Sequence, residues 1–491
     1  MLSRLMTALS SVDRTTALAF GLFAIVTTTV AAHHEPWRDE TDAWLMARDA
    51  SVAELFRYAG YAGTPALWYL IQVPFAKAGA PYATQRYLHL VIALAAAGLL
   101  LFRAPFTLPL RLALVFGYFF SFEYAVVARN YSSGILLCFG ALAMDRRRLR
   151  LAPAYGLAIG LAANTSVHFT FFAAALLVPF LWDAWTRRAD PRLWVGVALG
   201  AAGVALAVWQ LLPPPDGQMS PDFFAKFEPE WFRDMLSQPF TPGLYGRWTM
   251  AGGLLAATLV AARLWFAPRA AIVLTLSVAA LTYVFVFKYI GGVRHFGLLL
   301  VAMVVALWMA EREPESAARI PFPLRRAVNV GLVVLLLPSV VIAARAWRSE
   351  IQYAFSEASD MARFIIMNRL EGARIAGHPA MHAAAVLAFL PPRTFWFPSL
   401  AEAGSHMKWD ARFAAAHRMS VDDALARLKA QQQDWTDPGD PVLLLVAMPL
   451  VDPAAEGYQL LYRTPGRPWF VPSEVYYLYA PVTGACFAAA E

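Results

Sequence analysis

Apolar stretches of nearly membrane-spanning length recur along the first 346 residues of the chain. The first covers roughly 17–30, and ten more follow at about 86–102, 112–128, 131–144, 152–166, 167–183, 193–212, 247–265, 270–289, 294–311 and 326–346. A helix needs about 20 apolar residues to cross a bilayer, so the ends of the shorter stretches are loosely defined. The pattern predicts a polytopic α-helical membrane protein with about eleven transmembrane helices.

Arginines mark alternate connections between these stretches. The arginine-bearing connections are 103–111, 145–150, 187–192, 263–269 and 312–326. Basic residues gather in cytoplasmic loops, so we place all five in the cytoplasm. The N-terminus is then cytoplasmic, and the C-terminal region lies outside, in the periplasm of a bacterial inner membrane. A cleaved signal peptide ending near 30–32 is the alternative for the first stretch, and it also places residue 33 onward outside.

One further apolar stretch cannot cross the membrane in this orientation, because every arginine cluster after it would then lie outside. Residues 66–78 are apolar but short, and they include Gln72, Pro74 and Lys77. We expect an amphipathic helix lying in the outer interface. The outer side then receives a first loop at 33–86, a second loop at 213–246, and the tail.

The tail has a different pattern from the rest of the chain. Strand-like stretches at 374–377, 394–398, 442–448, 458–462 and 474–479 alternate with helical stretches at 380–390 and 421–432. Such alternation is typical of a small α/β domain. We therefore divide the chain into a membrane module at 1–346 and a periplasmic α/β domain at 347–491.

Composition agrees with the membrane assignment. Hydrophobic residues make up 59% of the chain and charged residues 15%, against about 25% in a soluble protein. The net charge of +7 comes from short arginine clusters between apolar stretches, which does not suggest a nucleic-acid partner. Two cysteines, expected to lie apart, cannot form a disulfide framework.

Three carboxylates crowd into four positions after the first apolar stretch: Asp39, Glu40 and Asp42. Like charges in a partly dry site repel one another, so one pKa rises toward the range of a general base. Adjacent residues point in different directions, so one of Asp39 and Glu40 could be the base and the other a substrate or structural ligand. The alternative is a set of solvated acids at a membrane edge that cap a helix.

The motif Trp37-x-Asp39-Glu40, the downstream Ala47-Arg48-Asp49 and the stretch from Gly63-Thr64-Pro65 to Trp68-Tyr69 resemble the GT-C glycosyltransferases. The likeness is closest to the branch with protein mannosyltransferases, lipid A aminoarabinose transferases and core-oligosaccharide transferases of Rhizobium type. These enzymes move a sugar from a polyprenyl-phosphate carrier to an acceptor at the outer leaflet. Their first outer loop carries such an acidic pair, followed by juxtamembrane helices. The likeness covers roughly the first 300 residues, but only the first loop is a specific motif.

The resemblance implies roles for the loop residues. Asp39 is expected to be the base that deprotonates the acceptor hydroxyl, with Glu40 in support. Asp42 and Trp68 are expected to bind substrate. The carrier phosphate leaves as an anion, so the site needs cations rather than an acid. Transfer is expected to be inverting, to a lipid, glycan or protein acceptor, and neither sugar nor acceptor can be read from the chain.

Two predicted outer turns supply candidate cations and polar groups. An arginine fork binds phosphate through two parallel hydrogen bonds, and Lys or His adds charge. The candidates for the donor phosphate are Arg129, Lys288, Arg294 and His295; those for binding substrate are Tyr131 and His168. The alternatives are arginines that reach lipid headgroups and a histidine satisfied by a neighbouring helix.

No nucleotide motif is present: the chain has neither a Walker loop nor a Gly-x-Gly-x-x-Gly after a strand. This favours a lipid-linked donor and no cofactor. Some GT-C enzymes need a divalent ion, but the adjacent His33 and His34 make a poor ligand pair, so we assign no metal ligand. The rival functions are a transporter or lipid flippase, whose ionisable residues lie mid-membrane, and a non-catalytic scaffold.

Overall fold

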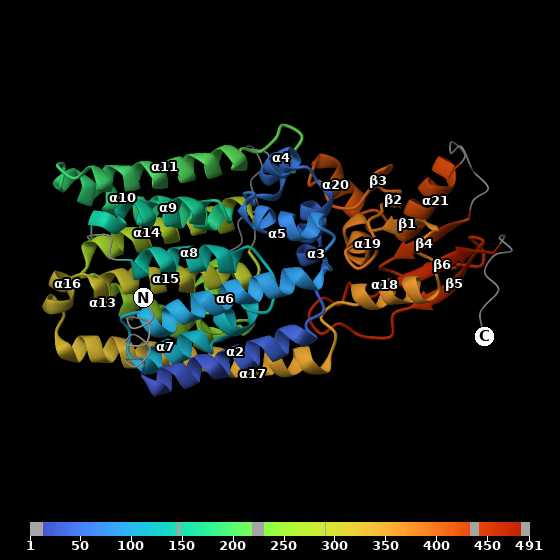
Figure 1. Ribbon diagram of the computed structural model, residues 1–491. Helices are drawn as coiled ribbons and strands as arrows, with labels where there is room; N and C mark the ends of the chain where they lie inside the picture. Colours follow the sequence, from blue (N-terminus) through green and yellow to red (C-terminus); the bar gives the residue numbers. More distant parts are fainter. Residues whose placement is uncertain (1–12, 145–148, 219–229, 290, 433–440, 483–491) are drawn as a thin grey trace.

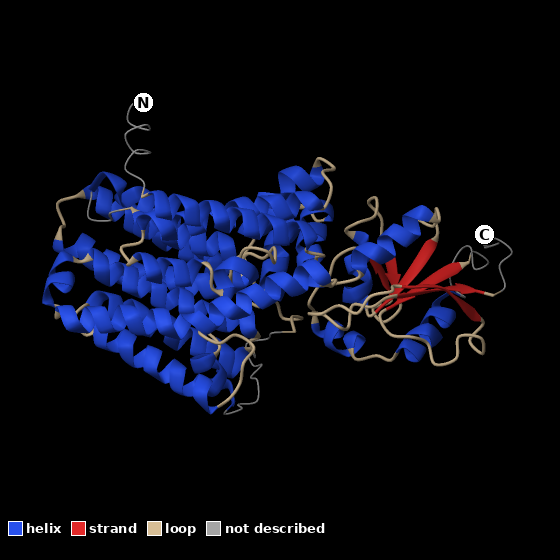
Figure 2. Ribbon diagram, turned by 90° about the horizontal axis from the view of Figure 1, so that it is seen from below, coloured by secondary structure: helices blue, strands red, loops and turns tan. Residues whose placement is uncertain are grey.

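The chain folds into a long bundle of helices with a small α/β domain at one end (Figure 1). The computed structural model describes residues 13–144, 149–218, 230–289, 291–432 and 441–482. Seen from below, the strands all lie beyond the end of the bundle (Figure 2). The sheet domain predicted at the C-terminus is therefore present, and the boundary predicted between residues 346 and 347 falls inside the last long helix, Phe322–Gln352.

The membrane module consists of helices of very different length. They are α2 (Arg14–His33), α3 (Arg38–Asp49), α4 (Val52–Ala62), α5 (Leu67–Lys77), α6 (Ala83–Arg103), α7 (Leu108–Val115), the π-helix η1 (Phe119–Glu123), α8 (Tyr131–Ala143), the 3₁₀ turn η2 (Leu149–Leu151), α9 (Ala152–Ala163), α10 (Val167–Thr186), α11 (Pro191–Leu211), α12 (Glu230–Ser237), α13 (Arg247–Leu264), α14 (Pro268–Tyr283), the π-helix η3 (Val284–Lys288), α15 (Val293–Arg312), α16 (Pro314–Arg319) and α17 (Phe322–Gln352).

Seven of the described helices are long and apolar enough to cross a membrane: α2, α6, α10, α11, α14 with η3, α15 and α17. The chain is therefore a multi-pass membrane protein, as predicted. The other four predicted stretches fold as α7 with η1, α8, α9 and α13. Of these, α8 and α9 are apolar but have only 13 and 12 residues. The number of about eleven spans stays a prediction.

The stretch predicted as one helix at 112–128 is broken, and that prediction was wrong. Helix α7 ends at Val115, and the short π-helix η1 follows. At the break the Tyr118 backbone N–H donates to Ser339 Oγ of α17 at 3.0 Å instead of continuing the α-helical pattern. Contact with a distant helix thus decides the local conformation, which periodicity alone does not show.

Glycines allow α9 and α11 to pack very closely. A Cβ atom on Gly156 would collide with the carbonyl oxygen of Gly196, and one on Gly203 would collide with Gly160 Cα. Small residues let membrane helices approach until their backbones touch. This pair of helices therefore forms a tight wall behind α10.

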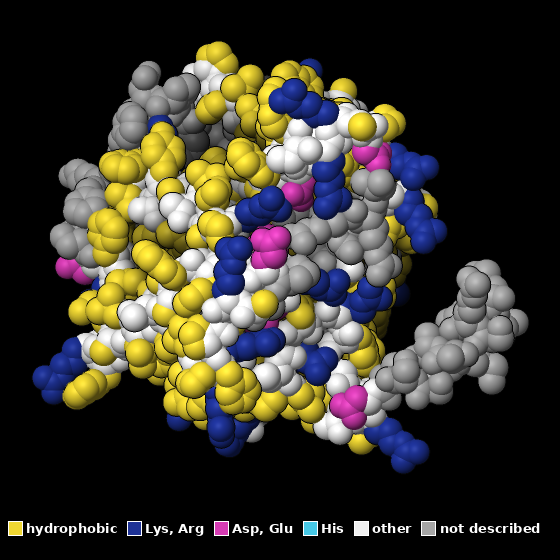
Figure 3. All heavy atoms as spheres, turned by 90° about the vertical axis from the view of Figure 1, so that its left-hand side faces the viewer, with side chains coloured by type: hydrophobic (Ala, Val, Ile, Leu, Met, Phe, Trp, Pro, Cys, Tyr) yellow, Lys and Arg dark blue, Asp and Glu magenta, His cyan; other side chains and the backbone are white. Residues whose placement is uncertain are grey.

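The arginine-bearing connections 103–111, 187–192, 263–269 and 312–326 gather at the end of the bundle away from the α/β domain (Figure 1). Residues 145–148 of the fifth predicted connection lie outside the described residues. Arg263 pairs with Glu311 at 2.9 Å, and Arg269 pairs with Asp183 at 2.8 Å, so three of these connections meet. Figure 3 looks onto this end and shows Lys and Arg side chains scattered among apolar ones, with few acidic residues. The clustering agrees with the arginine pattern that set the predicted orientation.

Three short helices, α3, α4 and α5, lie at the opposite end, between the bundle and the α/β domain (Figure 1). Helix α4 begins with a capping box of Ser51 and Glu54, and it ends at Gly63 with φ +62°. Helix α5 is the predicted helix at 66–78, and its 11 residues are too few to span. Its place in the membrane interface stays a prediction.

The α/β domain contains α18 (Ala358–Met367), β1 (Arg374–His378), α19 (Ala380–Leu387), β2 (Phe395–Phe397), β3 (Glu402–Gly404), α20 (Ala411–His417), α21 (Val421–Gln432), β4 (Val442–Val446), β5 (Tyr458–Arg463) and β6 (Tyr477–Pro481). The sheet order is β3-β2-β1-β4-β6-β5, with β1 parallel to β2 and β4 and the other pairs antiparallel. All five predicted strands and both predicted helices are present. Strand β3 and helices α18 and α20 were not predicted.

Strand β4 is buried on both faces, so it reads as a continuous apolar run. Leu443 and Leu445 pack with α18 and α19, whereas Leu444 and Val446 pack with α21. The first of these two cores also contains Trp44 of α3. The domain is therefore joined to the membrane module by a shared apolar core on α3, the helix that carries the acidic motif.

Candidate functional site

A cavity of about 560 Å³ lies where the bundle meets the α/β domain. Its wall draws on α3, α4, α5, the turn before α8, α10, η3 and α15, and on two segments of the domain. The lining includes Trp37, Arg38, Asp39, Asp42, Tyr61, Trp68, Tyr69, Arg129, Tyr131, His168, Lys288, Tyr289, Arg294, His295, Met381, Met407 and Trp409. A mostly apolar and aromatic pocket with a few convergent polar groups is the usual form of a ligand site.

Asp39 is the centre of an ion cluster in the cavity wall. Its Oδ2 lies 2.9 Å from Arg294 Nη2 and 3.2 Å from Arg129 Nη1, and Arg129 Nη1 also donates to the Asp39 carbonyl at 2.8 Å. The Arg294 guanidinium stacks over the Trp37 ring at 4.8 Å. Burial opposes the ionised form, but the two guanidinium groups hold the pKa of Asp39 below its usual value. Asp39 is a fixed carboxylate that keeps two arginines side by side.

Glu40 points away from the cavity into a buried network. It is 0% exposed, and its Oε2 lies 2.9 Å from His34 Nε2. On the other side of the same ring, His34 Nδ1 lies 2.8 Å from Glu350 Oε1 at the end of α17. Burial disfavours the charged ring, but the two carboxylates outweigh it and raise the pKa of His34 to about 10. A protonated His34 thus lies between two carboxylates.

The second oxygen of Glu40 holds the turn that carries Arg129. Glu40 Oε1 accepts the Ala128 backbone N–H at 2.5 Å. On the far side of the turn, Asn130 Nδ2 donates to the Thr165 carbonyl at 2.7 Å. The supporting role in catalysis predicted for Glu40 stays a prediction. Its geometry is that of a positioning residue, because it fixes the turn with Arg129 and does not line the cavity.

Asp42 lies one helical turn beyond Asp39 on the same face of α3, and both line the cavity. Asp42 Oδ1 accepts the Met407 backbone N–H at 2.9 Å, across 365 residues of sequence. Burial raises the pKa of Asp42 to about 7. Two carboxylates on one helix face therefore have opposite electrostatic environments.

A cluster of aromatic rings, those of Tyr131, His168 and His295, forms the wall next to Arg294. His295 lies 5.5 Å from His168 and 5.9 Å from Tyr131 between ring centroids. His295 Nδ1 accepts the Gly292 backbone N–H at 2.9 Å, which closes the first turn of α15. Both ring nitrogens of His168, and the Trp68 indole nitrogen, are buried with no hydrogen-bond partner in the described part of the chain. Buried polar groups without a partner are rare in folded proteins, and a functional role is one of their recognised explanations.

The α/β domain supplies the roof of the cavity through Met381 and the segment 407–409. Asp216, at the start of the second loop, ties this segment to the membrane module. Its carboxylate accepts the Tyr61 hydroxyl at 2.5 Å and pairs with Lys408 at 3.1 Å, and its carbonyl accepts the Ala411 N–H at 2.8 Å. The cavity is therefore complete only with the domain in place.

Nine of the ten residues predicted for the site line this one cavity: Trp68, Asp39, Asp42, Arg129, Tyr131, His168, Lys288, Arg294 and His295. Glu40 does not. The sequence reasoning missed Tyr61, Tyr69, Met381, Met407 and Trp409. Tyr69 lies in the stretch that carries the resemblance, so a signal existed for it. Nothing in the sequence marks the three residues from the domain.

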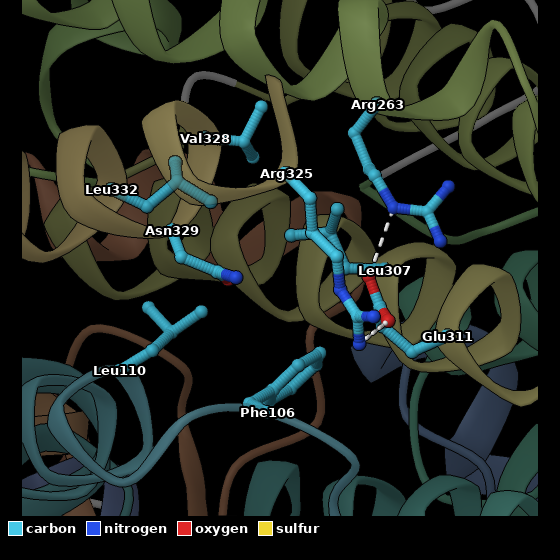
Figure 4. A pocket seen from close by; sticks show the side chains of 9 residues that line it. All are labelled: Phe106, Leu110, Arg263, Leu307, Glu311, Arg325, Val328, Asn329 and Leu332. Atoms are coloured by element: carbon cyan, nitrogen blue, oxygen red, sulfur yellow. Dashed lines mark hydrogen bonds and ion pairs between the residues drawn. The ribbon is translucent and has the colours of Figure 1, made fainter. Parts of the chain in front are cut away.

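Within the described residues, no three His, Cys, Asp or Glu side chains come together as metal ligands. A second charged pocket exists at the opposite end of the bundle, where Glu311 pairs with Arg263 at 2.9 Å and with Arg325 at 2.7 Å (Figure 4). Its volume is about 10 Å³, room for about one water molecule. It is too small for a substrate.

No protein-family model, curated protein or solved structure matches this chain.

Proposed function

We propose that the chain is a membrane glycosyltransferase that moves a sugar from a polyprenyl-phosphate carrier to an acceptor at the outer face of a bacterial inner membrane. The observation that carries this proposal is the ion cluster of Asp39, Arg129 and Arg294 in the wall of a 560 Å³ cavity. The resemblance of the loop around Asp39 to the GT-C enzymes agrees with it.

The cations suit an anionic leaving group. When the bond from the anomeric carbon to the phosphate oxygen breaks, negative charge develops on the phosphate, and positioned guanidinium groups stabilise it. Arg129 and Arg294 are already held side by side by Asp39, so little reorganisation is needed. Lys288 lines the same wall and adds positive charge. No acid is required on this side of the reaction.

The remaining lining suits a sugar. Trp68 and His168 line the cavity, and their ring nitrogens, buried in its wall, have no hydrogen-bond partner among the described residues. Aromatic rings of Tyr69, Tyr131 and Trp409 provide apolar faces around them. A ligand with several hydroxyls and an apolar ring face would satisfy both kinds of group.

The arrangement of charge supports the proposed orientation. The described arginine-bearing connections lie at one end of the bundle, and the α/β domain lies at the other (Figures 1 and 3). The cavity is on the side of the domain, since Met381, Met407 and Trp409 line it. With arginines in the cytoplasm, the cavity opens at the outer leaflet and the domain is periplasmic. We retain about eleven spans with a cytoplasmic N-terminus as part of the proposal, and the donor and acceptor as its partners, with no cofactor assigned.

Binding of the carrier tests the proposal directly. The purified full-length chain in lipid nanodiscs is titrated with undecaprenyl phosphate and analysed by native mass spectrometry, with Arg129→Gln/Arg294→Gln as the variant. Stoichiometric binding that this variant loses is expected. Mass spectrometry of envelope glycans and glycolipids with and without the gene should show one missing sugar. Carrier binding with movement of lipid across the bilayer, and no missing sugar, would indicate a flippase instead.

A further inference from the structure

We propose that Asp42, and not Asp39, accepts the proton of the acceptor hydroxyl, while Asp39 positions the arginine pair. This inference rests on the proposed function. It assigns different tasks to two carboxylates that share one helix face and one cavity. The assignment follows from what each carboxylate already contacts.

Asp39 is engaged through one carboxylate oxygen, and it differs from Asp42 in that two arginines hold this oxygen. Its Oδ2 is shared between Arg294 at 2.9 Å and Arg129 at 3.2 Å. Taking up a proton there would weaken both ion pairs at the moment when the arginines must stabilise the leaving phosphate. A carboxylate that two cations hold in its ionised form is also a weak base. Asp39 is therefore suited to orient Arg129 and Arg294.

Asp42 is held in place but remains available. In the described part of the chain it forms no ion pair, and only its Oδ1 accepts a hydrogen bond, from Met407 N–H at 2.9 Å. That bond fixes the carboxylate on the roof side of the cavity. Oδ2 has no partner among the described residues and can receive a proton. An acceptor that lies under the roof segment 407–409 would present its hydroxyl to this oxygen.

The reaction then balances as a single displacement. The acceptor oxygen forms a bond to the anomeric carbon, and its proton passes to Asp42 Oδ2. The bond from the anomeric carbon to the phosphate oxygen breaks, and its electron pair leaves with polyprenyl phosphate beside Arg129 and Arg294. The products are the glycoside, polyprenyl phosphate and a protonated Asp42, which returns its proton to water.

Charged groups around Asp42 set the pH at which it works. Burial is the main effect that raises the pKa of Asp42 to about 7; Asp39 raises it further, whereas Met407 N–H and Arg129 lower it. Tyr69 of α5 lines the same cavity, and burial together with the charge of Asp42 raises the pKa of its hydroxyl. Only the ionised form can accept a proton, so transfer should rise with pH through about 7 and then level off. Such a pKa near the working pH favours a general base.

Two isosteric variants separate the two tasks. Asp42→Asn keeps an oxygen for Met407 N–H, so its fold should be preserved, while Asp39→Asn removes the charge shared by the arginines. Asp49→Asn, on the same helix but outside the cavity, is the matched control. Transfer is measured in membranes from undecaprenyl-phosphate-linked radiolabelled sugars to endogenous acceptors, over a range of pH. Binding of undecaprenyl phosphate is measured in parallel.

Asp42→Asn should lower transfer by at least ~10²-fold, leave carrier binding intact and abolish the rise with pH. Asp39→Asn should lower transfer but keep that rise. If Asp42→Asn keeps most of the activity, or if Asp39→Asn is the variant that loses the rise, the assignment is wrong although the proposed function stands. Failure of the wild-type chain to bind carrier would instead overturn the proposed function. Infrared difference spectra give a readout without turnover. Burial raises the pKa of Glu35 to about 7 as well, so the spectra are recorded in a Glu35→Gln background. There, a carboxyl that titrates near pH 7 must disappear on adding Asp42→Asn, or the assignment is wrong.

Discussion

Two clusters at opposite ends of the bundle have the same chemistry, one carboxylate bridging two arginines. Near the α/β domain, Asp39 bridges Arg129 and Arg294. At the far end, Glu311 bridges Arg263 and Arg325 (Figure 4). The distances in both clusters lie between 2.7 and 3.2 Å, so geometry within the cluster does not tell them apart.

The space beside each cluster does tell them apart. The first borders a cavity of about 560 Å³ that a further carboxylate, Asp42, also lines, and the second borders a cavity of about 10 Å³. Arg263 is 1% exposed and lines this small cavity together with Leu110, Leu307 and Leu332. The far cluster therefore fastens α13, α15 and α17 together, and the near cluster is open to a ligand. Paired charges inside a membrane protein indicate a site only where there is room for a substrate.

The largest expected effect comes from removing one arginine of the open cluster. Arg294→Gln takes away a cation beside the leaving phosphate, so transfer should fall by ~10²–10³-fold. Arg263→Gln is the matched change in the closed cluster, and transfer per folded molecule should not change. Turnover of both purified variants, normalised to the folded fraction, measures the difference. Equal losses in the two variants would show that the arginines act through folding alone.

The next largest effect is expected in the far cluster, where a substitution should lower stability without affecting carrier binding. Glu311→Gln leaves the buried Arg263 guanidinium, 1% exposed, without its carboxylate, and breaking a buried pair costs about 3 kcal/mol or more. Arg325, the other partner of Glu311, is 44% exposed and adds little to this cost. The thermal unfolding midpoint should therefore drop clearly, while carrier binding by the folded fraction persists. Scanning fluorimetry in nanodiscs gives the midpoint, with exposed Glu315→Gln as the control. An unchanged midpoint would mean that the far cluster does not fasten its helices.

Much of the fold was accessible from the sequence because it depends on local composition. The length of an apolar stretch predicts helices such as α2 and α15. The positions of the arginines predict which helix ends lie on the same side of the membrane. The strands of the domain were found because β4 is apolar throughout and its neighbours are short and bounded by turns. The break after Val115 could not be predicted, since it depends on Ser339 of a distant helix.

Residues of the site could be predicted only where they lie at the end of a predicted helix next to other charged or polar residues. Arg129 and Arg294 were found this way. The different directions of Asp39 and Glu40 were expected, but the partner of Glu40 was not, because His34 and Glu350 meet only in the folded bundle. The contact of Asp42 with Met407 joins positions 365 residues apart, and no local pattern encodes it.

Glu40 offers a smaller effect that sharpens the comparison within the open site. In Glu40→Gln one of the two carboxylate oxygens becomes an amide that cannot accept a hydrogen bond, so either Ala128 N–H or His34 loses its partner. The turn with Arg129 should shift, and carrier affinity should fall about tenfold, roughly the worth of one charge-assisted hydrogen bond. The pH profile of transfer should stay as in the wild type, since Asp42 is untouched. A lost pH dependence would make Glu40 part of the proton transfer.

The smallest effect is expected at the roof, where the charges are open to water. Lys408 and Asp216 form an ion pair whose side chains are 33% and 56% exposed, so salt screens it and its contribution is small. In Lys408→Met the Tyr61 hydroxyl and Ala411 N–H still hold Asp216, and the KM for acceptor should rise by at most about fivefold. Raising the salt concentration should raise the KM of the wild type toward that of the variant and leave the KM of the variant nearly unchanged. Salt screens buried charges much less than exposed ones. A loss of transfer of ~10²-fold in Lys408→Met that does not depend on salt would therefore show that the roof is a rigid part of the site. The segment 407–409 would then be a fixed wall of the cavity, and the acceptor would have to enter elsewhere.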